Sequence, residues 1–342
     1  MKICQVLASR GAGGLERHFV DLCNGLAERH RVVAVAHPEF REQLRPEVTH
    51  EPLDLCGWRY NPASLTRLAA RLRRHRPDII HAHANKAAAM VGALRPVLGS
   101  AGLVATVHNV KRHNRVFGPF HRVIAVSRRT AAQLDHDRID IIFNGITPPP
   151  PAKASPDGRP AGDAGHDVLS QRALSAGRLV PAKGFDLLIR AWQGIDAPLL
   201  IAGEGPQRPR LERLIEELDL GDKVSLPGHR PDIPALLAGA ELVVIASLKE
   251  GFPYFLVESL FARKVVIATR VPGAEDILPD AYLVDTNDVA SLRARIIRVR
   301  EDLEGARTTF EPVWNRAAQE LTAARMTEKT EAVYRRTVSG RP

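Results

Sequence analysis

The chain is poor in cysteine, in aromatic residues and in long apolar runs, and each shortage excludes a class of protein. Its three cysteines, Cys4, Cys23 and Cys56, form no C-x-x-C pair, which argues against a disulfide framework or a zinc motif. Aromatic residues make up 5%, and no RNP-like pattern, zinc finger or recognition helix indicates a nucleic-acid partner. No apolar run approaches the roughly 18 residues that span a bilayer, and residues 1–7 are typical of a buried strand rather than a signal peptide. We therefore expect a cytoplasmic protein.

Acidic residues are missing from one long stretch. Residues 79–134 contain none, and the first 150 residues hold 22 Lys+Arg against 12 Asp+Glu, a net +10, whereas the remaining 26 against 27 give −1. The basic residues of the stretch are Lys86, Arg95, Lys111, Arg112, Arg115, Arg122, Arg128 and Arg129. Both a solvated basic face and a surface that faces an anionic partner fit this pattern.

The length of 342 residues predicts two domains, at roughly 150 residues each. Strand-like apolar runs alternate with amphipathic helical stretches in both halves, which predicts α/β domains with parallel sheets. We expect a first domain at 1–147, a linker rich in proline and glycine at 148–170, and a second domain at 171–314. A last helix from Asn315 to about Arg336, in the segment 315–342, has no strand after it and is free to pack back on the first domain.

A glycine-rich turn separates the first predicted strand from the first predicted helix. The dinucleotide fingerprint G-x-G-x-x-G, begun at Gly11, would need glycine where Glu16 stands, so an NAD-dependent oxidoreductase is disfavoured. A glycine turn before a helix N-terminus still suits a polar or anionic ligand. A tight turn without a ligand remains the alternative.

Two glutamates eight residues apart form the most specific motif. Glu250 lies in a loop with Gly251, Phe252 and Pro253, and Glu258 lies about one turn inside the predicted helix that follows. Carboxylates accept hydrogen bonds from sugar hydroxyls, and free N–H groups at a helix start suit phosphate. Either glutamate alone is more typical of a solvated surface.

With this spacing the sequence resembles the family 4 retaining glycosyltransferases of the GT-B fold, whose signature is E-x7-E. Further matches, spread over most of the chain, are the Gly-rich turn with Glu16, His81-Ala82-His83, Val107-His108, residues 123–127, Asn144-Gly145-Ile146, Gly177-Arg178-Leu179 with Lys183-Gly184, residues 203–206, and Gly228-His229. The resemblance implies an α/β fold with two doubly wound Rossmann-like domains that face a central cleft. It also implies transfer of a sugar from a nucleotide diphosphate sugar to a glycan or glycolipid, in lipopolysaccharide or surface polysaccharide synthesis.

The same resemblance implies roles for single residues. Arg178 and Lys183 would hold the donor diphosphate and stabilise the charge on the leaving oxygen, in place of a metal. Glu250 would bind the sugar hydroxyls, and His108 would contact the sugar or the reacting centre. The remaining donor contacts would come from Gly13, Gly14, Gly177, Gly205, Gly228, His229, Gly251, Phe252, Pro253 and Glu258. The acceptor or the membrane surface would meet Glu16, Lys111, Arg112, Arg115 and Arg122.

No cofactor and no metal are expected beyond the donor substrate. His81 and His83 are disfavoured as metal ligands because no third ligand falls at a familiar spacing. The expected partners are the nucleotide sugar, an anionic acceptor and the anionic inner face of the membrane, on which the protein would lie peripherally. Two alternatives stay open: a basic binding protein for nucleic acid or a phosphorylated ligand, and an epimerase or phosphorylase that uses the same fold.

Overall fold

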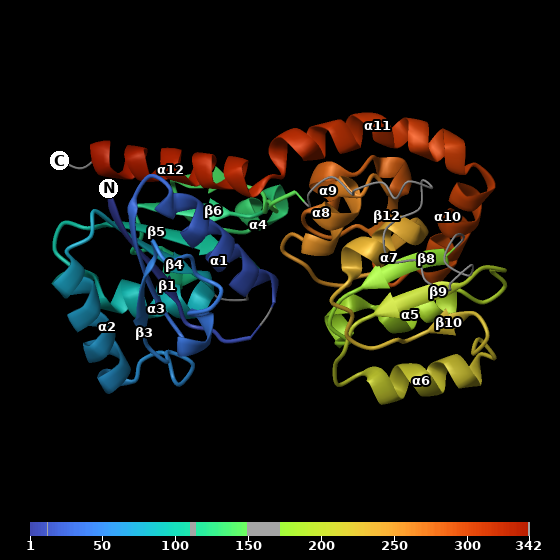
Figure 1. Ribbon diagram of the computed structural model, residues 1–342, viewed down its shortest axis with the longest axis horizontal. Coiled ribbons are helices and arrows are strands. Elements are labelled where there is room, and N and C mark those ends of the chain that lie inside the picture. Colours follow the sequence, from blue (N-terminus) through green and yellow to red (C-terminus); the bar gives the residue numbers. More distant parts are fainter. Residues whose placement is uncertain (12, 110–113, 149–171, 341–342) are drawn as a thin grey trace. The chain divides into compact units, whose positions relative to one another are not determined.

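Two parallel sheets organise the chain, one in each of two compact units. A computed structural model describes residues 1–11, 13–109, 114–148 and 172–340. Unit 1 comprises Met1–Ile146 and Glu320–Pro342, and unit 2 comprises Thr147–Gln319. Figure 1 shows the strands of each sheet side by side with helices on both of its faces. The predicted α/β class is confirmed.

Unit 1 has seven strands in the order β3-β2-β1-β4-β5-β6-β7, and all neighbouring strands are parallel. Reversal of the strand order between β1 and β4 is the arrangement of doubly wound nucleotide-binding domains. The strands are β1 Lys2–Leu7, β2 Arg31–Ala36, β3 Thr49–Pro52, β4 Ile79–His83, β5 Gly102–Val107, β6 Arg122–Ala125 and β7 Ile139–Ile141. The α-helices are α1 Gly14–Ala27, α2 Pro62–His75, α3 Ala84–Leu94, α4 Arg128–Ala132 and α12 Ala323–Ser339.

Unit 2 repeats this topology with six parallel strands in the order β10-β9-β8-β11-β12-β13. The strands are β8 Arg172–Ala176, β9 Leu199–Ala202, β10 Val224–Ser225, β11 Ala240–Ile245, β12 Val265–Thr269 and β13 Leu283–Val284. The α-helices are α5 Phe185–Ala191, α6 Arg208–Glu217, α7 Ile233–Gly239, α8 Tyr254–Phe261, α9 Ala274–Ile277, α10 Val289–Glu301 and α11 Leu303–Glu320. The short 3-10 turns of unit 1 are η1 Pro38–Phe40, η2 Arg95–Val97 and η3 Arg115–Phe117, and those of unit 2 are η4 Pro181–Lys183 and η5 Asp280–Tyr282.

The sheet of unit 1 has an apolar core on each face. Ile3 belongs to one core and Cys4 to the other, as expected because successive strand residues point to opposite faces. Phe19 of α1 and Tyr334 of α12 lie in the first core, and Leu68 of α2 lies in the second. Helices α1 and α12 therefore cover one face, and α2 and α3 the other.

The single last helix expected from Asn315 to Arg336 is wrong, because the segment contains parts of two helices. Helix α11 begins at Leu303 and ends at Glu320, and α12 begins at Ala323. The hydroxyl of Thr322 accepts a hydrogen bond from the N–H of Arg325, and this N-cap starts the new helix. Helix α12 packs on α1 and β5 in unit 1, where it appears in red in Figure 1.

Gly145 permits the chain to cross at the start of α12. A Cβ atom there would lie 2.2 Å from the carbonyl oxygen of Thr322. On either side of it, the N–H of Ile146 donates to Leu321 O at 3.0 Å, and the N–H of Ala323 donates to Ile146 O at 2.8 Å. The Asn-Gly-Ile motif thus has a packing role.

The expected linker lies outside the described residues except for Pro148.

None of the described helices combines the length and the apolar composition needed to cross a membrane.

Candidate active site

Glycines let the loops after β8 and β9 interlock in unit 2. A Cβ atom on Gly203 would lie 1.9 Å from Gly177 O, and one on Gly205 would lie 2.4 Å from Leu179 O. Both glycines have positive φ, +149° and +158°, a region that other residues rarely adopt. Gly177 and Gly205, predicted to bind the donor, therefore have a packing role that does not depend on a ligand.

The loops after β8 and β11 bring Lys183 to Glu250. The N–H of Leu248 donates to Ala182 O at 2.8 Å, and Gly184, at φ +62°, leaves room for Ala246 O, which would lie 2.1 Å from a Cβ. Lys183 Nζ then donates to Glu250 Oε1 at 2.5 Å. This pair spans β8 and β11, between which the strand order reverses, the usual ligand position in such sheets.

Glu250 is held from a second direction. Ser247 Oγ donates to the same Oε1 at 2.8 Å, and only 12% of the glutamate side chain is exposed, against 26% for Lys183. One carboxylate oxygen is therefore committed to the protein. Oε2 forms no contact that the structure records among the described residues.

Arg178 lies on the loop after β8 and is exposed. Its guanidinium makes no hydrogen bond or ion pair with any residue that the structure describes. Of the two predicted cations, Lys183 is bonded to Glu250, whereas Arg178 is available to bind an anion.

The second glutamate lies one turn inside α8, as predicted. Helix α8 starts at Tyr254, and its N-cap residue Pro253 provides no side-chain hydrogen bond to the first N–H groups of the helix. Gly251, Phe252 and Pro253 are buried. The side chain of Phe252 is 5% exposed and packs near Gly273, where a Cβ would lie 2.8 Å from Phe252 Cα. Its predicted contact to the donor would therefore have to come from the backbone.

Gly228 and His229, a pair predicted to contact the donor, differ in their exposure. Gly228 is buried and, at φ +87°, lies against Glu204, whose Oε1 would be 2.8 Å from a Cβ. Its carbonyl accepts a hydrogen bond from Gly203 N at 2.8 Å. His229 is exposed and is the member of the pair whose side chain is accessible.

The placement of Glu16 on the acceptor or membrane surface is wrong. Glu16 is 8% exposed, because its carboxylate folds back over the glycine-rich turn. It accepts hydrogen bonds from Ser9 Oγ at 2.5 Å and from Gly13 N at 3.0 Å. Gly13 is the N-cap of α1, and Gly14 begins the helix. The carboxylate therefore caps α1 and stabilises the turn.

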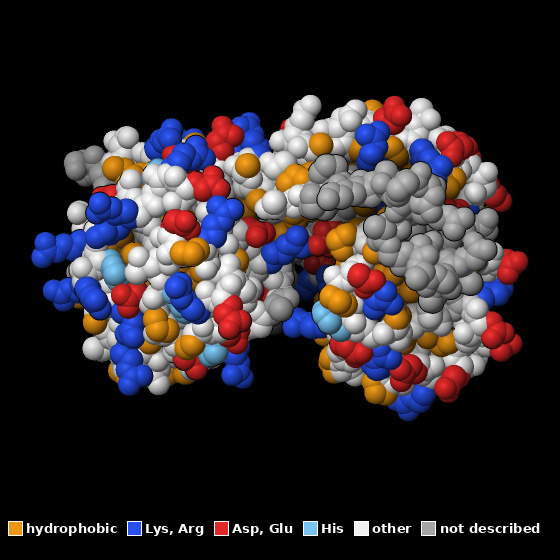
Figure 2. Space-filling model, viewed as in Figure 1, with side chains coloured by type: hydrophobic (Ala, Val, Ile, Leu, Met, Phe, Trp, Pro, Cys, Tyr) orange, Lys and Arg blue, Asp and Glu red, His pale blue; other side chains and the backbone are white. Residues whose placement is uncertain are grey.

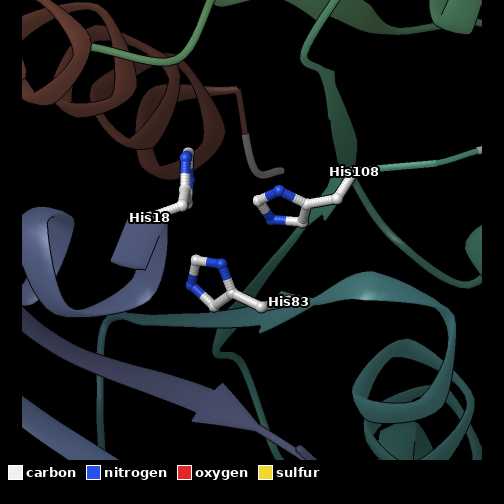
Figure 3. Close-up of side chains that lie close together, drawn as sticks. All are labelled: His18, His83 and His108. Atoms are coloured by element: carbon white, nitrogen blue, oxygen red, sulfur yellow. The ribbon is translucent and has the colours of Figure 1, made fainter. Parts of the chain in front are cut away.

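His108 belongs to a cluster of buried ring nitrogens in unit 1. His18, His83 and His108 each offer a ring nitrogen, and the three nitrogens lie within 4.8 Å of one another (Figure 3). Burial lowers the pKa of His18 to about 4 and the pKa values of His83 and His108 well below the usual range. The three imidazoles are therefore neutral at pH 7.

His18 was not among the predicted site residues. No third ligand falls at a familiar sequence spacing from His81 and His83, but the fold brings His18 and His108 to His83. His83 ends β4, His108 directly follows β5, and His18 lies in the second turn of α1, which follows β1. Strands β1, β4 and β5 are neighbours, so their carboxyl ends meet. The sequence feature that could have indicated the cluster is a histidine at or beyond the carboxyl end of each of three adjacent strands.

The basic stretch is only partly available to an anionic partner. Arg122 donates to Asp140 Oδ2 at 2.8 Å and is 22% exposed, so this predicted surface residue is committed to an ion pair. Arg115 is exposed. Lys111 and Arg112 lie outside the described residues.

The comparison with known families covers both units. A model of "Glycosyltransferase Family 4" matches residues 12–148, and a model of "Glycosyl transferases group 1" matches residues 165–310. The chain is 29% identical over 309 residues to a lipopolysaccharide core biosynthesis glycosyltransferase of Rhizobium meliloti, a match that covers 85% of each chain. The chain belongs to the family 4 glycosyltransferases. This confirms the predicted resemblance and supports a glycosyltransferase over the non-catalytic binding protein that was kept as an alternative.

Solved structures agree on the fold of this glycosyltransferase. Anabaena Alr3699/HepE, solved in complex with UDP and with UDP-glucose, has a TM-score of 0.81 at 20% identity for the UDP complex and covers 97% of this chain and 99% of its own. A sucrose-phosphate synthase from Thermosynechococcus elongatus has a TM-score of 0.82 at 20% identity, with 99% and 100% covered. The fold is GT-B.

Proposed function

We propose that this glycosyltransferase moves a sugar from a nucleotide diphosphate sugar to a glycan or glycolipid, without a metal on the diphosphate and with retention of the anomeric configuration. The observation that carries the proposal is the Lys183–Glu250 pair, at 2.5 Å, where the strand order of unit 2 reverses. It places an ammonium and a carboxylate together, as a substrate with both phosphate and sugar hydroxyls requires.

The donor phosphates have three suitable partners in unit 2. Lys183 is partly exposed beside Glu250, Arg178 is exposed on the preceding loop, and α8 begins without a side-chain cap. A helix N-terminus with free N–H groups binds phosphate well. The likeness to a protein solved with UDP-glucose supports a uridine nucleotide as the first donor to test.

The cations also explain departure of the diphosphate. Negative charge grows on the leaving oxygen as its bond to the anomeric carbon breaks, and a fixed cation stabilises that charge more than it stabilises the bound donor. Lys183 is preorganised by Glu250 for this role. Arg178 would add a second positive charge, so a divalent ion on the diphosphate is not required.

Retention is proposed because a double displacement lacks a suitable nucleophile. Glu250 is the carboxylate expected at the sugar, and its Oε1 already accepts hydrogen bonds from Lys183 and Ser247. Hydrogen bonds of this kind stabilise the carboxylate and lower its tendency to attack carbon. Departure and attack on the same face of the sugar, assisted by the diphosphate, is the remaining route.

The acceptor is proposed to be an anionic glycolipid of a surface polysaccharide. The similarity to a lipopolysaccharide core glycosyltransferase and the +10 net charge of the first 150 residues support this class. An acceptor of this kind would require the enzyme to lie peripherally on the cytoplasmic face of the membrane.

The test is transfer by the full chain with UDP-sugars in EDTA, without added Mg²⁺ or Mn²⁺. We expect release of UDP that depends on acceptor, and an NMR coupling constant of the product's anomeric proton that matches that of the donor. An inverted product would overturn the retaining assignment. Turnover that appears only with Mg²⁺ or Mn²⁺ would overturn the role of Arg178 and Lys183. An altered free sugar nucleotide, without transfer, would support an epimerase instead.

A further inference from the structure

Three imidazoles of unit 1 converge with one unpartnered nitrogen each. His18 Nε2, His83 Nδ1 and His108 Nε2 are buried and have no hydrogen-bond partner among the described residues. The rings lie close together, with centroids 4.5 Å apart for His18 and His108 and 5.6 Å apart for His18 and His83. Buried polar atoms without a partner cost free energy, so this arrangement calls for a ligand.

A chain of hydrogen bonds fixes the tautomer of His83. Gln5 Nε2 donates to Tyr334 Oη at 2.8 Å, so Gln5 Oε1 accepts the hydrogen bond from His83 Nε2 at 2.7 Å. Tyr334 in turn donates to His81 Nδ1 at 2.6 Å, and His81 Nε2 donates to Thr106 Oγ1 at 2.7 Å. His83 therefore carries its proton on Nε2, and its Nδ1 presents a bare lone pair.

His18 is oriented in the same way from the other side. Its Nδ1 lies 3.0 Å from Asn144 Oδ1, an acceptor, so Nδ1 holds the proton and Nε2 presents a lone pair. Two lone pairs on neutral rings thus point into one buried space beside a third imidazole. Lone pairs repel an anion such as phosphate or carboxylate, and they attract a cation that accepts electron pairs.

We propose that His18, His83 and His108 bind a transition-metal ion of the Zn²⁺ or Co²⁺ type in unit 1. His18 and His83 are each held by a hydrogen bond at the other ring nitrogen, and three imidazoles around one space form a typical site for such an ion.

The geometry requires only a small contraction. Nitrogens at 2.0–2.1 Å from one tetrahedral zinc ion lie about 3.3 Å apart, whereas the three nitrogens here lie within 4.8 Å of one another. The nitrogens would move closer to one another by at most about 1.5 Å when the ion binds. Three protein ligands leave the fourth position open to water or to an oxygen of a substrate.

The residues that would hold the metal belong to unit 1, whereas the residues proposed to bind the donor phosphates belong to unit 2. The metal would be held by imidazoles that follow β1, β4 and β5, whereas Lys183 and Glu250 follow β8 and β11. Binding of Zn²⁺ and metal-free departure of the diphosphate can therefore both hold. Since Mg²⁺ prefers oxygen ligands, it should not compete for the histidines.

The experiment is a titration of the full chain, freed of metal with a chelator, by Co²⁺. We expect one equivalent to bind, with the intense visible absorption bands of four-coordinate Co²⁺, and Zn²⁺ to displace it. Zn²⁺ should raise the Tm, and Mg²⁺ should not. Absence of these bands, together with an unchanged Tm in Zn²⁺, would overturn the proposal.

Variants separate this site from adventitious binding by the chain's other histidines. His18→Leu should lose the Co²⁺ bands, whereas His136→Ala, which removes a histidine bonded to Phe120 O, should keep them. Equal affinities in wild type and His18→Leu would refute the assignment. Tyr334→Phe removes the partner that orients Gln5 and should weaken Zn²⁺ binding by about 10-fold to 100-fold. Because it deletes no ligand, it remains informative if His18→Leu does not fold.

Discussion

Substitution of Lys183 should lower the activity of the enzyme without lowering the stability of its fold. It is 26% exposed and makes its one recorded ion pair with Glu250, so Lys183→Ala removes charge without opening the core. We expect kcat to fall by about 100-fold, since a preorganised charge at a developing oxyanion is worth about 3 kcal/mol, and donor affinity to fall as well. Steady-state kinetics with varied donor measure both.

Controls at the same position sharpen that prediction. Lys183→Arg keeps the charge and should retain more activity than Lys183→Ala, and Lys249→Ala removes a neighbouring exposed lysine and should change little. Arg178→Ala should also reduce kcat, because its guanidinium is available to the diphosphate. Near-normal turnover in both Lys183→Ala and Arg178→Ala would contradict the leaving-group role.

The buried histidines should make the stability of the metal-free protein depend on pH. Burial lowers the pKa of His18 from 6.5 to about 4, so below pH 6.5 the unfolded state binds a proton that the folded state does not. The free energy of unfolding must therefore fall as the pH drops from about 6.5 toward 4, by about 1.4 kcal/mol per pH unit for one such histidine.

Denaturant titrations at several pH values, in EDTA, measure this slope. His30 and His50 also have lowered pKa values, so the informative quantity is the difference between wild type and His18→Leu. The variant should have the shallower slope between pH 6.5 and 5. Parallel curves would mean that His18 is protonated in the folded protein.

At the scale of elements, Gly184 couples the fold to the position of Lys183. Gly184→Ala would place a Cβ 2.1 Å from Ala246 O at φ +62°, whereas Gly194→Ala, at φ +79°, meets no atom within 4 Å. In both variants the left-handed backbone lowers the free energy of unfolding by about 1–2 kcal/mol. We expect Gly184→Ala to cost clearly more, and to lower kcat as well, because the displaced loop carries Lys183.

Chemical denaturation and kinetics of the two glycine variants check this. If Gly194→Ala and Gly184→Ala lose the same stability and neither loses activity, the contact between the two loops does not position the lysine.

Elements with a strong periodic pattern were predictable from the sequence. Alternating buried strands and amphipathic helices predicted the parallel sheets of both units. The short strand β3 at Thr49–Pro52 was not predicted, because its four residues are Thr-His-Glu-Pro and it lies at the edge of the sheet. The break between α11 and α12 depends on where Leu321 and Thr322 pack, which no local pattern reveals.

The site was predictable where its residues form a linear motif. The structure brings together Lys183, which the resemblance named, and Glu250, which the spacing of the two glutamates named; the roles of Lys183, Glu250 and Glu258 stay predictions. Glu16 was assigned to the acceptor or membrane surface through the resemblance, whereas its carboxylate turns inward to Ser9 and Gly13. The histidine cluster could not be predicted from local sequence, because its members meet only through the order of the strands. The hydrogen-bonded chain that orients His83 likewise joins Gln5 to Tyr334, which are 329 residues apart.

At the scale of the whole molecule, basic charge is concentrated in unit 1. Figure 2 shows Lys and Arg side chains gathered where α2 lies. On this helix Arg67 and Arg73 are exposed and form no ion pair among the described residues. The loop before α2 exposes two aromatic rings, with Trp58 67% and Tyr60 43% accessible. Tryptophan and tyrosine with arginine are typical of membrane interfaces.

This surface predicts reversible binding to anionic membranes. Each basic residue near an anionic leaflet contributes about 1 kcal/mol, and the charges are screened beyond roughly 10 Å at 0.1 M salt. In liposome sedimentation, the full chain should bind anionic but not neutral vesicles and should dissociate as salt rises.

Variants locate the binding surface. Arg67→Glu with Arg73→Glu, or Trp58→Ser, should weaken binding to anionic vesicles. Arg213→Glu with Arg298→Glu, at two exposed positions of unit 2, should not. Because neither pair touches Lys183 or Glu250, UDP binding should be unchanged in both. If the two charge reversals weaken vesicle binding equally, the attraction follows net charge rather than the surface at α2. If the wild type ignores anionic vesicles at low salt, the basic residues form only a solvated face.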